Sequence, residues 1–135
     1  MPMKFVKFYS REDLQNNPQD IYVFGDNLTA VGLGGQAAAC RGEPNAFGIP
    51  TKIAPSNHPD AFLFDVYLDR MRMLYQFLFN TLDYHTSIGN TVVWPEDGIG
   101  TGLADLPNKS PEIYALIQLM FEALKRRAVH TEAQG

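Results

Sequence analysis

The chain has little cysteine, no excess of positive charge and no long apolar run. Cys40 is the single cysteine among 135 residues, which excludes an intrachain disulfide and favours a reducing compartment. The formal net charge of −4 argues against a protein that coats nucleic acid through its overall charge. No run approaches the roughly 18 apolar residues of a membrane span. Because the N-terminus also lacks the features of a signal peptide, we expect a cytoplasmic protein with no membrane partner.

The chain does contain enough apolar sequence for one folded domain. Hydrophobic residues make up 45% and aromatic residues 12% of the chain, which is typical of globular rather than disordered proteins. We expect residues 1–128 to form a single domain and residues 129–135 to be a frayed C-terminal tail.

Short apolar runs alternate with helical patterns along the sequence. Strands are predicted at residues 4–9, 21–24, 46–51 and 91–94. The strand at 21–24 lacks polar alternation and should be buried on both faces, whereas Pro50 places the third strand at a sheet edge or at its own end. The alternation predicts an α/β fold, in which ligands gather at the carboxyl ends of the strands.

Three helices are predicted between and after these strands. A short helix of small residues should span 36–41, a long one should begin near Pro59, and the last should begin at Ser110 as its cap. The long helix is expected to bury one face, made of Leu63, Val66, Tyr67, Met71, Leu74, Phe77, Leu78 and Leu82. The last helix is expected to bury Ile113, Leu116, Ile117, Met120, Phe121 and Leu124.

Two glycine loops each follow a predicted strand. Gly34 and Gly35 stand just before the short helix, where free backbone N–H groups favour an anion such as phosphate. The second loop, "GIGTG" at 98–102, matches neither the dinucleotide fingerprint nor the P-loop. The pair predicts a phosphate-binding site, and the alternative is that both loops are tight turns without a ligand.

The order of these motifs resembles the macrodomain family, which binds ADP-ribose. "VFGDN" at 23–27 and "GLGGQAA" at 32–38 resemble the family's strand, glycine cluster and helix of small residues. "IGTGLADLP" at 99–107 is similar to its second loop. The resemblance covers about residues 20–125 and implies a three-layer α/β/α sandwich with a mixed sheet.

Two phrases resemble one branch of that family most. They are "IPTK" at 49–52 and "GTGLADL" at 100–106. The branch includes terminal ADP-ribose glycohydrolases and antitoxins that strip ADP-ribose from DNA. By this resemblance the partners are ADP-ribose, or a related nucleotide, and an ADP-ribosylated protein or DNA.

The resemblance also implies roles for particular residues. Asn27 would hold the distal ribose, while either Asp26 or Asp20 would read the adenine; the alternative for Asp26 and Asn27 is an Asx-turn. The expected ligand-binding residues are Asp26, Asn27, Gly34, Gly35, Gly98, Ile99, Gly100, Thr101, Gly102 and Leu103.

In the glycohydrolase branch a lysine attacks the C1″ carbon of the sugar and an aspartate manages protons. This implies Lys52 and Asp105 as the catalytic pair, with Asp97 and Glu96 as substitutes because Ala104 intervenes where the family's aspartate often follows Gly-Leu directly. The alternative for Lys52 is a solvated strand end. The histidines and Cys40 have no zinc-ligand spacing, so no metal is expected, and no cofactor is called for.

Three functions therefore remain open. The first is a hydrolase that removes ADP-ribose from a modified protein or nucleic acid. The second is a reader or sponge that binds ADP-ribose or a related NAD-derived nucleotide without turnover. The third is a scaffold whose glycine turns are structural only. A thermal shift on adding nucleotide separates the first two from the third, and turnover separates the first from the second.

Overall fold

The computed structural model describes residues 3–134, and its α/β class agrees with the prediction from the sequence. In chain order the elements are β1 (Met3–Val6), α1 (Arg11–Asn16), β2 (Ile21–Asn27), α2 (Ala37–Cys40), β3 (Ala46–Lys52), the 3-10 turns η1 (Pro59–Ala61) and η2 (Asp65–Tyr67), α3 (Leu68–Ser87), β4 (Val92–Pro95), α4 (Leu106–Lys109) and α5 (Pro111–Gln134). Each predicted strand is present, and no bound differs from the prediction by more than three residues.

The four strands form one sheet in the order β1-β4-β2-β3, and every pair is parallel. The mixed sheet that the resemblance implied is therefore wrong. The physical reason is the connections: each strand is followed by a helical segment that returns the chain to the amino edge before the next strand begins. The third strand lies at the sheet edge, as Pro50 predicted.

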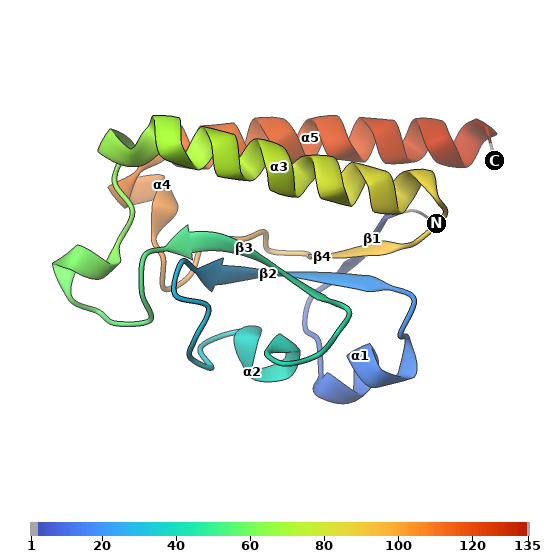
Figure 1. Cartoon of the computed structure of the whole chain (residues 1–135), viewed down its shortest axis with the longest axis horizontal. Coiled ribbons are helices and arrows are strands. Elements are labelled where there is room, and N and C mark those ends of the chain that lie inside the picture. Colours follow the sequence, from blue (N-terminus) through green and yellow to red (C-terminus); the bar gives the residue numbers. More distant parts are fainter. Residues whose placement is uncertain (1–2, 135) are drawn as a thin grey trace.

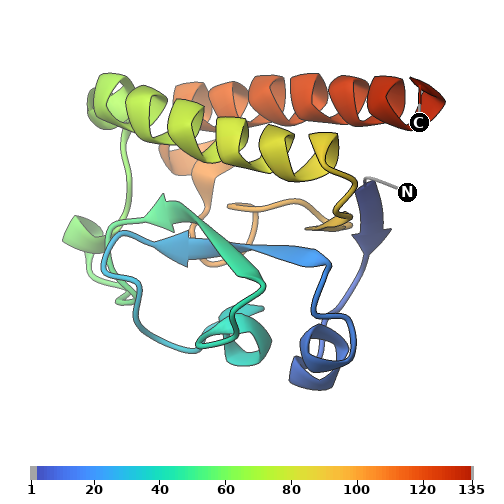
Figure 2. The same cartoon turned by 45° about the vertical axis from the view of Figure 1, so that its right-hand side comes forward.

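Helices lie on both faces of the sheet: α3 and α5 cover one face, and α1 and α2 lie against the other (Figure 1, Figure 2). Successive side chains of β4 point to opposite faces of the sheet, so this strand contributes to the core on each face. Val92 and Trp94 belong to the core under α3 and α5, whereas Val93 belongs to the smaller core with α1 and α2. Because β4 is buried on both faces, it reads as a continuous apolar run.

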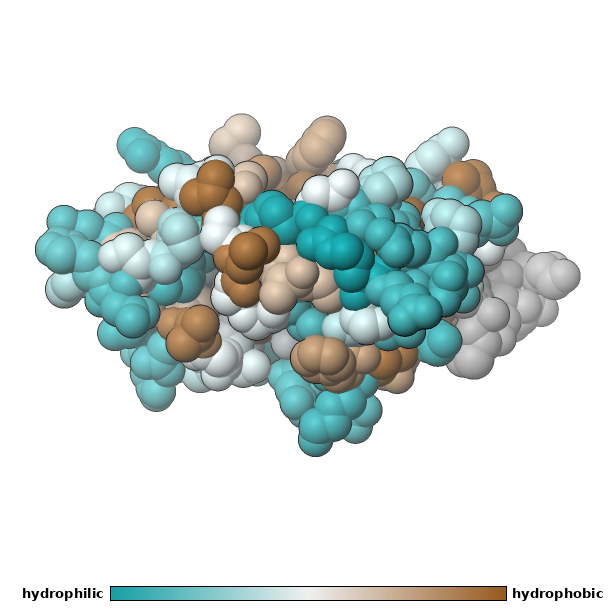
Figure 3. Space-filling model, turned by 90° about the horizontal axis from the view of Figure 1, so that it is seen from below, coloured by the Kyte–Doolittle hydropathy of each residue, from teal (hydrophilic) through white to brown (hydrophobic). Residues whose placement is uncertain are grey.

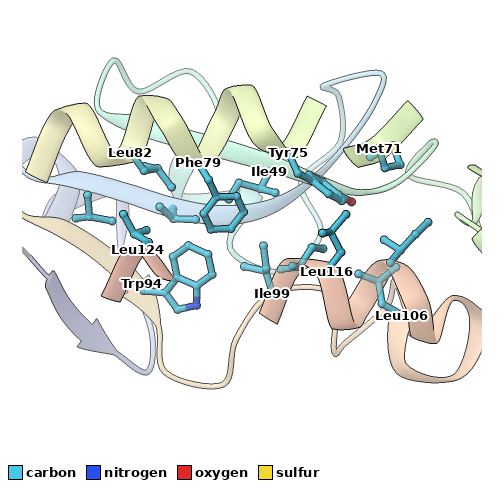
Figure 4. Packing of buried hydrophobic residues seen from close by; sticks show 14 of the residues in the cluster. Ile49, Met71, Tyr75, Phe79, Leu82, Trp94, Ile99, Leu106, Leu116 and Leu124 are labelled. Carbon is cyan, nitrogen blue, oxygen red and sulfur yellow. The ribbon is translucent and has the colours of Figure 1, made fainter. Parts of the chain in front are cut away.

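The larger core contains aromatic side chains of α3 and β4 (Figure 4), and Phe121 of α5 packs against it. The ring of Trp94 lies 6.0 Å from that of Phe79 and 4.6 Å from that of Phe121, measured between centroids. Aromatic pairs at such distances add roughly 0.5–1.5 kcal/mol each beyond the area that they bury.

The buried face predicted for the long helix is partly wrong. The residues that α3 buries are Met71, Tyr75, Phe79, Leu82 and Thr86. Met71 and Leu82 were predicted, but Val66 and Phe77 are exposed. Val66 lies before the helix, because α3 begins at Leu68 after 3-10 turns and an antiparallel bridge from Phe62 to the end of β3. Phe77 lies within α3 but two positions from both Tyr75 and Phe79, so it points away from the face that they bury.

The last helix buries four residues of the predicted stripe, Ile113, Leu116, Ile117 and Leu124, while Met120 and Phe121 are partly buried against the core; the helix is capped differently from the prediction. The carboxylate of Asp65 accepts hydrogen bonds from the backbone N–H groups of Glu112 and Ile113. The Ser110 hydroxyl, predicted as the cap, is buried and has no partner within the described residues. Helix α5 continues to Gln134, past the start predicted for the tail, and Gly135 lies outside the described residues. No helix within residues 3–134 combines the length and apolarity needed to cross a bilayer.

Candidate functional site

One cleft of about 460 Å³ lies at the carboxyl edge of the sheet. Segments that follow all four strands line it: Lys7 after β1, the first glycine loop after β2, Pro55 after β3 and the second glycine loop after β4. The central strands β2 and β4 are neighbours, and the chain leaves them toward opposite faces, to α2 and to α4–α5 (Figure 1). In open parallel sheets such a divergence opens the crevice in which ligands bind.

The first glycine loop is anchored at several points. The side chain of Gln36 pairs with the backbone of Tyr9, accepting from its N–H at 2.7 Å and donating to its carbonyl oxygen at 3.3 Å. Gly32 has a φ of +94°, and a methyl group there would lie 2.9 Å from Cβ of Pro55, so the loop packs tightly against the segment after β3. The cleft wall is therefore held in one shape by the fold around it.

Asp26 is paired with Arg41, a residue that the sequence analysis did not single out. Both carboxylate oxygens of Asp26 accept from the guanidinium, at 2.7 and 2.9 Å. These hydrogen bonds raise the pKa of Arg41 above its ordinary value. Asp26 does line the cleft, as predicted, but its carboxylate is occupied by a cation.

Asn27 forms the Asx-turn that was the alternative interpretation. Its amide donates to the carbonyl oxygen of Val31 at 2.8 Å, and its side-chain oxygen accepts from the N–H of Thr29 at 3.1 Å. The side chain also lines the cleft, where its residue is 8% exposed. Asp20, the alternative to Asp26, precedes β2 and therefore lies at the amino end of this seven-residue strand, away from the cleft.

The second glycine loop is shaped by left-handed backbone. Gly98 and Gly100 have φ values of +82° and +79°. A methyl group on Gly100 would lie 2.4 Å from Cδ1 of the buried Leu106, whose N–H donates to the Gly100 oxygen at 2.9 Å. The hydroxyl of Thr101 donates to the carbonyl oxygen of Asp97. Only glycine satisfies both the backbone and the space at position 100.

Both loops contain backbone N–H groups without a hydrogen-bond acceptor in residues 3–134. Within the described residues, the N–H groups of 31–36 and of 99–104 donate no hydrogen bond to protein. Gly34 and Leu103 bring the two loops together, since a methyl on Gly34 would touch Cδ1 of Leu103 at 3.5 Å. Successive N–H groups in loops of this kind form concave sites suited to anions.

Lys52 ends β3 and is 8% exposed, so the solvated strand end that was its alternative is wrong. Its Nζ donates to the carbonyl oxygen of Ser56 at 2.7 Å and lies 4.5 Å from the ring centroid of Phe62. No carboxylate lies within ion-pair distance of it among residues 3–134. Burial lowers the pKa of Lys52, because the charged form loses its hydration.

The structure does not bring Asp105 into the cleft beside Lys52. Asp105 stands at the start of α4 in a left-handed conformation, and its carboxylate accepts from the side-chain amide of Asn108 at 2.8 Å. Asp97, named as a substitute, does line the cleft, whereas Glu96 does not. Across residues 3–134, no three His, Cys, Asp or Glu side chains are grouped so as to hold a metal ion.

The sequence analysis missed two cations of the cleft, Lys7 and Arg41. Lys7 lies inside the strand predicted at 4–9, and it follows the strand only because β1 ends at Val6, so the sequence pattern did not place it at the carboxyl end. Arg41 is 15 positions away from the carboxylate that it binds, and no local sequence pattern predicts that pairing.

Fold and site together define an α/β protein with an anion-suited cleft at the carboxyl edge of a parallel sheet. The chain belongs to the Family of unknown function (DUF7831), whose model matches residues 4–120. Neither the curated proteins nor the solved structures provide a match to the chain.

Proposed function

We propose that the cleft binds ADP-ribose or a related NAD-derived nucleotide, with the diphosphate between the two glycine loops. The observation that carries this proposal is that the free N–H groups of 31–36 and 99–104 belong to two loops lining a single cleft. Backbone donors of this kind bind phosphate oxygens without a charged side chain. Two of the motifs that resemble those of macrodomains, at 32–38 and 99–107, include these same two loops.

The charges of the cleft support an anionic ligand. Three cationic residues line it, Lys7, Arg41 and Lys52, against two acids, Asp26 and Asp97. Because Arg41 neutralises Asp26, two lysines face one unpaired carboxylate. The cleft thus concentrates positive charge in a chain whose formal net charge is −4.

The size and rim of the cleft support a nucleotide rather than a bare phosphate. A volume of about 460 Å³ falls within the range of roughly 300–1,000 Å³ typical of small-molecule sites. Val31 and Leu103 line it and are 52% and 69% exposed, which offers apolar surface to a base. The face that carries α1 and α2 is mixed, with hydrophobic patches among hydrophilic side chains (Figure 3). As part of the proposal, the helices on both faces form a macrodomain-like three-layer sandwich around an all-parallel sheet.

The test is titration calorimetry with ADP-ribose, AMP and NAD. We expect ADP-ribose to bind in the micromolar range, about −8 kcal/mol. Gly35→Glu should abolish binding, because it places a carboxylate in the wall of the cleft. Gly42→Glu is the matched control: both glycines have positive φ and open space around them, but only Gly35 lines the cleft. No heat and no thermal shift at millimolar ADP-ribose would refute the proposal.

A second candidate function is hydrolysis of the bond between ADP-ribose and a modified macromolecule. The observation that favours it is Lys52, a residue of the cleft lining whose amine has a lowered pKa and, within residues 3–134, no acid beside it. A neutral amine is the form that attacks carbon, so burial moves Lys52 toward a nucleophile. When Nζ attacks C1″, the bond from C1″ to the macromolecule breaks; Asp97, which lines the cleft, takes the role implied for Asp105 by giving a proton to the leaving atom and then accepting one from the water that releases ADP-ribose from Lys52.

Turnover of an ADP-ribosylated substrate tests this second function. Lys52→Ala should abolish hydrolysis while ADP-ribose binding stays within about tenfold, because the diphosphate contacts come from backbone. Asp97→Asn should lower the rate more than Asp105→Asn. If the wild-type protein binds ADP-ribose but turns over no substrate, the protein is a reader and the hydrolase hypothesis fails.

A further inference from the structure

The guanidinium of Arg41 lines the cleft with part of its hydrogen-bonding capacity unused. Its Nη1 and Nη2 donate to Asp26 and its Nε donates to the carbonyl oxygen of Gly32, at 3.2 Å. These contacts occupy three of the five N–H groups of an arginine, so two remain free. The side chain is 23% exposed, which leaves the group accessible to a ligand.

Arg41 is held in place from several sides. The Asp26 side chain is only 10% exposed and packs against Gly48, where a methyl group would lie 2.7 Å from Oδ2. The ring of Phe24 lies below the guanidinium, 5.6 Å from its central carbon. A cation fixed in this way loses little conformational freedom when a ligand binds, which favours affinity.

We propose that Arg41 selects phosphorylated ligands, donating one of its free Nη N–H groups to a phosphate oxygen of the ligand while Asp26 holds the guanidinium in place. The inference rests on the proposed function, since the phosphate is that of the nucleotide between the glycine loops. Because its five N–H groups point in several directions, an arginine can donate to a second acceptor while a carboxylate holds it, and it stays charged throughout the ordinary pH range. Lys7, the exposed cation of the cleft, has no such fixed geometry. Asp26 is then a positioning residue and does not read adenine.

The chain offers a matched control in Arg11. This residue also forms an ion pair, with Glu43 at 2.9 Å, and also donates to a backbone oxygen, that of Ala38 at 3.0 Å. It does not line the cleft. Arg11→Lys therefore reports the cost of weakening a similar ion pair away from the ligand.

The experiment compares ADP-ribose with adenosine, which has the same base and one of the same sugars but no phosphate. We expect Arg41→Lys to weaken ADP-ribose binding about tenfold by calorimetry and to leave the adenosine affinity, from NMR titration, within twofold. Arg11→Lys should leave both affinities within twofold. In the wild-type protein an Nη–H resonance of Arg41 should shift on adding ADP-ribose and stay in place on adding adenosine; this measurement needs no variant to fold.

The possible failures are distinguishable. If the wild-type protein does not bind ADP-ribose, the proposed function and this inference both fall. If it binds but Arg41→Lys keeps the affinity within twofold, or if the Arg41 resonance does not move, Arg41 does not contact phosphate. Equal losses for ADP-ribose and adenosine in a folded Arg41→Lys protein would mean that Arg41 only supports the loop.

Discussion

Gly100→Ala should destabilise the protein far more than Gly98→Ala, although the two glycines are two positions apart in one loop. Both have φ near +80°, where a residue with a side chain costs about 1–2 kcal/mol. Nothing lies within 4 Å of a methyl group on Gly98, whereas one on Gly100 would lie 2.4 Å from Cδ1 and 3.0 Å from Cγ of Leu106. Overpacking a buried side chain adds about 1–3 kcal/mol, so Gly100→Ala should cost roughly 2–5 kcal/mol in total.

Urea unfolding followed by tryptophan fluorescence measures both variants. Trp94 is the single tryptophan and lies in the large core, so its emission reports global unfolding. The m-value should stay constant, because neither substitution changes the surface that unfolding exposes.

A double-mutant cycle with Leu106→Ala identifies the cause. Leu106→Ala removes the Cγ and Cδ atoms with which the new methyl group collides. In that background Gly100→Ala should lower the free energy of unfolding only by the cost of the positive φ. The expected coupling is about 1–3 kcal/mol. Equal losses for Gly98→Ala and Gly100→Ala, or a coupling near zero, would refute the steric argument.

Three further predictions follow from single contacts. Burial lowers the pKa of Lys52, so just below the ordinary value of 10.5 the native state binds fewer protons than the unfolded state. The free energy of unfolding in urea should therefore rise as the pH approaches 10.5, and Lys52→Met should lack this rise. Asp65→Ala should lower the free energy of unfolding by about 1–3 kcal/mol in the same assay, because α5 loses the carboxylate that accepts hydrogen bonds from its first N–H groups. Asp60→Ala, at a side chain that is 93% exposed, should change it by less than about 0.5 kcal/mol. Burial raises the pKa of Cys40 to about 12, so iodoacetamide should modify this thiol only after unfolding, and rapid labelling of the native protein would contradict its burial.

The sequence by itself determined the strands, the order of the elements and the position of the two glycine loops. Apolar runs such as 21–24 and 91–94 mark strands locally, because a strand in a parallel sheet is buried on both faces whatever its neighbours are. Pro50 marked an edge strand, since it has no N–H to donate to a second neighbour. The glycines marked the loops that line the cleft, because the need for left-handed backbone is a property of single residues.

Only the tertiary structure decided which side chains meet. Whether the sheet is mixed or parallel depends on whether each connecting segment brings the chain back to the same end of the sheet before the next strand begins. Asp65 caps α5 by accepting a hydrogen bond from the N–H of Glu112, 47 positions later in the chain. The cap predicted from the local sequence was Ser110. Arg41 in the cleft and Asp105 outside it likewise depend on how the loops after β2 and β4 pack. Contacts between distant segments are set by packing and ion pairing in three dimensions, and local sequence patterns carry little information about them.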